Sequence, residues 1–146
     1  MSHSIESALA AATLYSDDKE YVLVKLHARA VTAAAGVLAE IAEPFGALIV
    51  DKDEVSLIVE RNGFEEFAKR LPDHTLSDKT YRLLTLDVEL GLELVGFMAR
   101  VSAALAAAGV NIFPYAAYSR DHLLVSSHQY ETARQTLEQL KSSVSS

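Results

Sequence analysis

Cysteine is absent from this sequence of 146 residues. Its absence excludes disulfides, thiolate nucleophiles and zinc sites built from cysteine. Runs of basic residues are absent too, and the formal net charge of −7 would repel nucleic acid and anionic membranes on average. No apolar run approaches the roughly 20 residues that span a bilayer, and the first residues lack the cationic start and apolar core of a signal peptide. We therefore expect a cytoplasmic protein with no nucleic-acid or membrane partner.

Signatures of catalysis and of cofactor binding are also missing. The sequence has no phosphate loop, no dinucleotide fingerprint and no nucleophile elbow, so we expect no cofactor and no catalytic residue. None of the histidines stands at metal-ligand spacing from another histidine or an acid on one helix face, and we expect no metal site. These histidines are His3, His27, His74, His122 and His128. The acidic segment 51–54 is interpreted as a solvated turn rather than a cation site.

Internal repetition is the most informative feature that is present. The segment 13–26 and the segment 75–86 both contain Thr-Leu, then Ser, then Asp-Lys-x-Tyr, then an apolar stretch. Their tyrosines, Tyr21 and Tyr81, lie 60 positions apart (81 − 21). The segments 36–39 and 96–99 keep this offset, and further matches follow in the same order with a slowly increasing offset. A period near 60 is too long for a solenoid unit, so it indicates two small duplicated domains.

Hydrophobic periodicity predicts the same elements in each copy. Strand-like alternation at 22–26 and 84–86 is followed by helical three- and four-residue spacing, which in copy two runs from Leu94 to Ala108 and ends at Gly109. Two hairpin strands follow, and then a second helix, which Asn62 is expected to cap in copy one.

Each copy thus reads β-α-β-β-α, preceded by a short candidate strand near Thr13 or Thr75. The interpretation is an α+β fold of two ferredoxin-like modules at 8–71 and 72–141, with antiparallel sheets, helices on one face and the modules side by side.

The segments 93–101 and 108–113 resemble the ACT domain family. In the first, an acidic residue, two further positions and a glycine lead into an apolar helix, and the second resembles the glycine-led entry to the next strand. The segments 53–59 and 111–125 are similar to tandem-ACT proteins related to the aspartate kinase regulatory region and to arginine sensors. Where that family usually carries Ser-Thr, this chain has Ala116 and Ala117.

The resemblance implies a small-molecule site between the strand-to-helix loop of one module and the second strand of its neighbour. An exposed helix start near Gly96 suits a carboxylate, and Asp121 could pair with an ammonium. The candidate ligand-binding residues are Glu89, Leu90, Gly91, Glu93, Val95, Gly96, Asn111, Ile112, Phe113 and Asp121.

The expected function is therefore a non-catalytic regulatory or sensor protein that binds a small molecule, an amino acid in particular, and acts through tandem ACT modules. It is expected to form a homodimer and to act on a regulated partner protein. Two alternatives stay open. One is a structural or interaction protein that uses the fold without a metabolite, which Ala116 and Ala117 favour. The other is a small ferredoxin-like enzyme, which would need a perturbed acid or base in a cleft.

Overall fold

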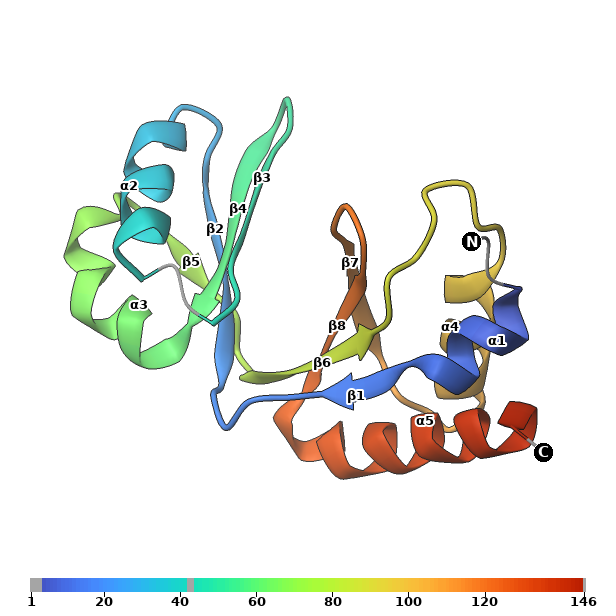
Figure 1. The fold of residues 1–146 in the computed structure, drawn as a ribbon. Helices are drawn as coiled ribbons and strands as arrows, with labels where there is room; N and C mark the ends of the chain where they lie inside the picture. Colours follow the sequence, from blue (N-terminus) through green and yellow to red (C-terminus); the bar gives the residue numbers. More distant parts are fainter. Residues whose placement is uncertain (1–3, 42–43, 146) are drawn as a thin grey trace. The chain divides into compact units, whose positions relative to one another are not determined.

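The computed structural model describes residues 4–41 and 44–145, and within them the chain forms two compact units. The continuous unit is residues 17–81. The discontinuous unit combines residues 4–16 with residues 82–145 (Figure 1). Both consist of an antiparallel sheet and helices, which confirms the predicted α+β class.

The continuous unit runs β-α-β-β-α-β along the chain. Its elements are β2 (Tyr21–His27), α2 (Val31–Ile41), β3 (Ala47–Val50), β4 (Glu54–Glu60), α3 (Arg61–Phe67), the 3-10 turn η1 (Ala68–Arg70) and β5 (Thr75–Leu76). The strands pair in the order β3-β4-β2-β5, all antiparallel. Alternate residues of β2 and β4 turn to the helices, where Val24, Leu57 and Phe64 join one buried cluster.

The helix α3 corrects one predicted detail. Asn62 is not its cap, because the helix begins at Arg61, two residues before the start that a cap at Asn62 would give. Glu60 occupies the cap position, and its carboxylate accepts hydrogen bonds from the backbone N–H groups of Asn62 and Gly63. A carboxylate in this position satisfies two N–H groups that the first helical turn leaves without acceptors.

The discontinuous unit takes its first two elements from the beginning of the sequence. These are α1 (Ile5–Ala11) and β1 (Thr13–Tyr15), and they are followed by β6 (Tyr81–Asp87), α4 (Phe97–Ala107), β7 (Ile112–Ala116), β8 (Asp121–Ser126), the 3-10 turn η2 (Ser127–Gln129) and α5 (Tyr130–Ser145). The strand β6 lies between β1 and β8, and β7 is at the edge.

The short strands before each copy lie on sheets that the sequence did not predict. The strand at Thr13, which precedes copy one, pairs with β6 of copy two, and the strand at Thr75, which precedes copy two, pairs with β2 of copy one. The compact units therefore do not coincide with the predicted ranges 8–71 and 72–141. Those ranges describe the repeated sequence and remain a prediction about modules.

The core of the discontinuous unit lies between one sheet face and the helices. The residues Phe97, Val101 and Leu105 follow one another at four-residue steps along α4 and are buried, as an amphipathic helix requires. They pack with Leu84 and Leu86 of β6 in a single cluster. The helix ends as the glycine predicts, because Gly109 has a φ of 75° and its N–H donates to the carbonyl of Ala106.

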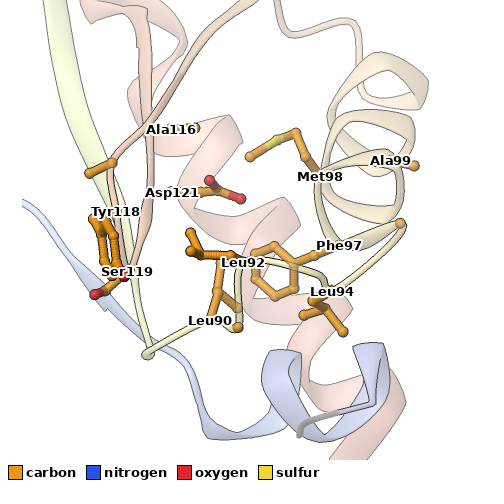
Figure 2. Close-up of a pocket in the computed structure, with 13 residues that line it drawn as sticks. Leu90, Leu92, Leu94, Phe97, Met98, Ala99, Ala116, Tyr118, Ser119 and Asp121 are labelled. Atoms are coloured by element: carbon orange, nitrogen blue, oxygen red, sulfur yellow. The ribbon is translucent and has the colours of Figure 1, made fainter.

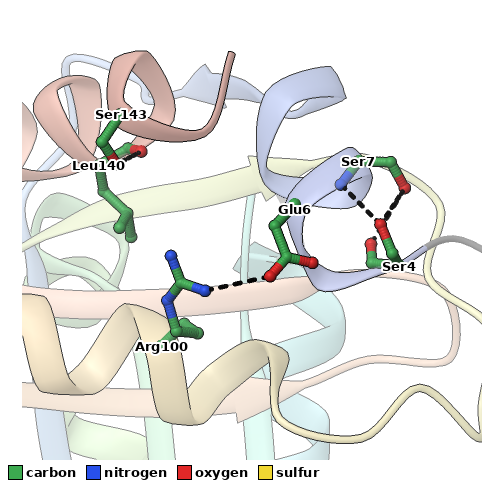
Figure 3. A network of polar contacts seen from close by, with 6 residues as sticks. All are labelled: Ser4, Glu6, Ser7, Arg100, Leu140 and Ser143. Atoms are coloured by element: carbon green, nitrogen blue, oxygen red, sulfur yellow. Dashed lines mark hydrogen bonds and ion pairs between the residues drawn. The ribbon is translucent and has the colours of Figure 1, made fainter. Parts of the chain in front are cut away.

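The helix α1, which the sequence analysis did not predict, belongs to the same core. Ala8 and Leu9 are fully buried in it. Ser4 caps the helix by accepting a hydrogen bond from the Ser7 N–H, and Glu6 lies 3.4 Å from an Arg100 nitrogen (Figure 3). The ion pair is exposed and contributes little, so the buried side chains hold α1 in place.

Candidate functional site

A cavity of about 340 Å³ lies at the start of α4 in the discontinuous unit. Three segments surround it: the loop between β6 and α4, the first turn of α4, and the tip of the β7–β8 hairpin (Figure 2). The lining residues are Leu90, Gly91, Leu92, Leu94, Gly96, Phe97, Met98, Ala99, Ala116, Ala117, Tyr118, Ser119 and Asp121.

Backbone hydrogen bonds shape the two walls. The Leu90 N–H donates to the Ser119 carbonyl at 2.7 Å, which ties the loop to the hairpin tip. The loop then turns, with the Leu94 N–H donating to the Gly91 carbonyl at 3.1 Å. The Arg120 guanidinium donates to the Asp87 carboxylate at 2.7 Å and so holds the hairpin to the end of β6. Both walls are thus fixed to the sheet.

Asp121 is the charged residue of the lining. It begins β8, and because side chains alternate along a strand it shares a face with Leu123 and Val125, which are core residues. Its carboxylate therefore extends the core face into the cavity, where Met98 and Leu92 lie beside it (Figure 2). The pKa of Asp121 is raised because partial burial disfavours the charged form, and the neighbouring His122 opposes that rise.

His122 lies on the opposite sheet face. Its Nδ1 is 2.8 Å from the hydroxyl of Thr85, a residue that is itself buried. Burial lowers the pKa of His122, the charge of Asp121 raises it, that of Arg120 lowers it, and that of Asp87 raises it again. The neutral ring is thus the form that the fold favours.

The start of α4 forms the cavity floor. Gly96 precedes the helix with a φ of 91°, a conformation that L side chains rarely adopt, and no side chain caps the helix there. The first helical hydrogen bond is donated by the Arg100 N–H to the Gly96 carbonyl. The N–H groups of a first helical turn have no intrahelical acceptor, and they carry the positive end of the helix dipole.

The structure brings part of the predicted site together. Leu90, Gly91, Gly96 and Asp121 line the cavity. Three residues of the same loop, Glu89, Glu93 and Val95, are exposed and do not line it, and Val95 is 84% exposed.

The predicted strand residues lie elsewhere. Asn111, Ile112 and Phe113 are at the opposite end of β7 from the hairpin tip and do not line the cavity. The Asn111 N–H donates to the side chain of Gln129, which in turn donates to the Gly109 carbonyl. Whether these three residues bind a ligand stays a prediction.

Most of the apolar lining and the hairpin tip were not predicted from the sequence. The missed residues are Leu92, Leu94, Phe97, Met98, Ala99, Ala116, Ala117, Tyr118 and Ser119. The hairpin pattern could have identified the tip, because it places segment 116–121 at the end of β6 where the loop begins. The leucines of the loop recur at every second position, at 90, 92 and 94. In an extended chain this spacing indicates that the three side chains point to the same side.

Residues 4–41 and 44–145 contain neither a metal-binding group of side chains nor a membrane-spanning helix. No group of three or more histidine or acidic side chains in these ranges could hold a metal ion. At the acidic turn, Asp51 accepts hydrogen bonds from the N–H groups of Asp53 and Glu54, which lower its pKa. Within the same ranges, no helix combines the length and the apolar character needed to cross a membrane.

Comparison with known proteins identifies the segment that carries the cavity. Residues 76–139 match the model of the ACT domain family. No curated protein sequence matches the chain.

Solved structures share the fold across nearly the whole chain. A Vibrio cholerae protein of unknown function, described as a possible transport protein, matches with a TM-score of 0.73 at 23% identity over 94% of this chain and 96% of that one. The regulatory subunit of aspartate kinase from Thermus flavus matches with a TM-score of 0.69 at 16% identity, over 89% and 98%. An Agrobacterium tumefaciens protein matches with a TM-score of 0.69 at 20% identity, over 89% of each chain.

Proposed function

Because residues 76–139 match the ACT domain family, we propose that this chain is a non-catalytic regulatory or sensor protein whose cavity binds a small molecule, an amino acid in particular. Two ferredoxin-like ACT modules in tandem, at 8–71 and 72–141, are part of this proposal. A homodimer, a regulated partner protein and a cytoplasmic location belong to the same proposal.

The observation that carries the proposal is the cavity itself. It lies within the matched segment, at the junction of a strand, a glycine-led helix start and a hairpin tip. A helix start favours a carboxylate, and the half-buried Asp121 favours an ammonium. An α-amino acid carries both groups on one carbon, so the two features suit it together.

The likeness to aspartate kinase regulatory subunits supports the regulatory part of the proposal. Those proteins are described as regulatory subunits, and this chain covers 98% of one of them. A protein of this kind acts when its ligand has different affinities for two states of the protein or of its complex. We therefore expect binding without turnover.

A second candidate is an interaction module that binds no metabolite. The alanines at 116 and 117 supply no hydroxyl groups at the two positions where the family usually carries Ser-Thr, and three large apolar residues beside the cavity are exposed: Leu92 by 70%, Val95 by 84% and Tyr118 by 80%. Exposed apolar residues that gather in one place are typical of protein contacts.

A thermal-shift screen of the full chain against the twenty amino acids separates the two candidates. A ligand at 100 times its Kd adds about 2.7 kcal/mol of apparent stability, a shift of several degrees. The variant Ala116→Phe would fill the cavity and abolish the shift, and the matched variant Ala107→Phe, at an exposed position outside the lining, would keep it. If no amino acid raises the Tm of the wild-type protein, the interaction module is the better supported function.

A further inference from the structure

We propose that the cavity selects ligands that join an ammonium group to an uncharged apolar side chain, as leucine and methionine do, over amino acids whose side chains end in a charge. The inference rests on the proposed function and specifies its ligand class. It follows from the charge, the apolar surface and the size of the cavity.

The charges around the cavity are of one sign. Asp121 is the one charged residue in the lining, and all lining residues belong to the described part of the chain. The sequence between Leu83 and Ala99 contains three acidic residues and no basic one. Three arginines border this region, and each has a partner: Arg82 lies over the Tyr130 ring, Arg100 pairs with Glu6 and Arg120 pairs with Asp87. A ligand with an acidic side chain would therefore bring a second negative charge, besides the carboxylate at the helix start, to a lining that contains no cationic side chain.

An ammonium group has a partner in the same place. The Asp121 carboxylate is half-buried among apolar residues, and Figure 2 shows it directed between the hairpin and the first turn of α4. A bound ammonium would replace part of the hydration that this carboxylate loses on folding. Hydrogen bonds between charged groups contribute about 1.5–3 kcal/mol, which corresponds to roughly 10- to 150-fold in affinity.

Apolar side chains from the loop and from the helix start form one part of the lining, beside the hydroxyl groups of Tyr118 and Ser119. Leu90, Leu92 and Leu94 come from the loop, and Phe97 and Met98 come from the helix start. Leu92 is 70% exposed, so an apolar ligand side chain that covers it removes hydrocarbon surface from water. A lysine or arginine side chain would place its charge against the same surface. Glu89 and Glu93, the acidic residues of the loop, are exposed and lie outside the lining, so they give that charge no partner within the cavity.

The size of the cavity agrees with this class. Ligand cavities commonly measure about 300–1,000 Å³, and a volume of about 340 Å³ is at the lower end of that range. A single amino acid suits it better than a nucleotide.

Calorimetric titration of the full chain tests the class directly. L-leucine, L-methionine, L-lysine, L-arginine and L-glutamate are compared with 4-methylpentanoate, which has the leucine skeleton without the ammonium. We expect leucine or methionine to bind at least about tenfold more tightly than the three charged amino acids, and than 4-methylpentanoate. Equal binding of 4-methylpentanoate would overturn the role of the ammonium.

Three variants assign the effect to residues. D121N should weaken leucine binding roughly 10-fold or more, and L92N should weaken it several-fold. L76N changes another exposed leucine, on β5 and outside the lining, and should leave binding unchanged. Circular dichroism of each variant shows that it is folded.

The outcomes separate this inference from the proposed function. Tighter binding of lysine, arginine or glutamate than of leucine, lost in D121N, would overturn the inference and leave the amino-acid sensor in place. Binding of none of these amino acids by the wild-type protein would overturn both.

Discussion

The pairing of the two short strands is open to a test by cross-linking, because the chain has no cysteine of its own. In the structure Thr13 is opposite Asp87 and Lys25 is opposite Thr75, and all four residues are exposed. The double variants T13C/D87C and K25C/T75C should therefore form disulfides on mild oxidation. The pairs T13C/K25C and T75C/D87C represent strands that stay with the copies they precede, and they should remain reduced.

The expected stabilisation follows from the loops that the disulfides close. A link between positions 13 and 87 closes a loop of about 74 residues (87 − 13), and chain entropy gives about 4.4 kcal/mol at 25 °C. The loss of the exposed ion pair between Asp87 and Arg120 subtracts at most about 1 kcal/mol. The net gain of about 3–4 kcal/mol should raise the Tm by roughly 10 °C relative to the wild-type protein, and slightly more relative to the reduced variant, which lacks the ion pair as well.

Mass spectrometry of the oxidised monomer, with and without reductant, reports which pairs have formed. Thermal unfolding of the same samples gives the stabilisation. Disulfides in T13C/K25C and T75C/D87C, together with free thiols in the other two variants, would refute the strand pairing and the two compact units derived from it.

Three further predictions concern single residues. Leu9→Ala should lower the free energy of unfolding by about 2–5 kcal/mol because Leu9 is fully buried, whereas Leu92→Ala, at a largely exposed position, should change it by less than about 0.5 kcal/mol in urea titrations. Gly96→Ala and Gly109→Ala should each lower the free energy of unfolding by about 1–2 kcal/mol because both glycines have positive φ. Only Gly96→Ala, in the cavity lining, should also alter ligand-induced thermal shifts. An equal ligand response in both variants would contradict the site. His122→Gln should flatten the fall in Tm between pH 7 and pH 5. The pKa of His122 is lower in the folded protein than the unfolded value of 6.5, so the stabilisation by its neutral ring is complete above pH 6.5 and is lost as the pH falls toward the folded pKa. An unchanged pH profile of the Tm would argue against the buried neutral form.

Much of the fold could be predicted because its elements are long enough to show a period. The seven-residue strand β6 and the eleven-residue helix α4 carry clear apolar patterns, and Gly109 ends α4 as expected. The partner of β5 could not be predicted, because two exposed residues contain no information about which sheet they join. The helix α1 was missed because seven residues show less than two full turns of periodicity, although Ser4 is a typical capping residue.

The candidate site was predicted on one side only. The glycines of the β6–α4 loop and Asp121, which the sequence analysis proposed, line the cavity. The other wall was expected at segment 111–113, because the family resemblance places a ligand against the second strand of a neighbouring module. Within one unit the loop instead lies beside the hairpin tip, since the Leu90 N–H donates to the Ser119 carbonyl. That contact joins residues far apart in the sequence, and local periodicity does not encode it.

The division into a continuous and a discontinuous unit has a consequence for synthesis on the ribosome. The continuous unit, residues 17–81, has all its strands and helices once Tyr81 has emerged, so it can fold while translation proceeds. The buried face of α1 is made earlier but packs against α5, which ends at Ser145, about 130 residues later than Ser16 (145 − 16). At about 5–20 residues per second, roughly 6–26 seconds pass before all of α5 has been made, so Ala8 and Leu9 lack part of their buried cluster during that time. During that interval α1 is the segment for a chaperone to protect.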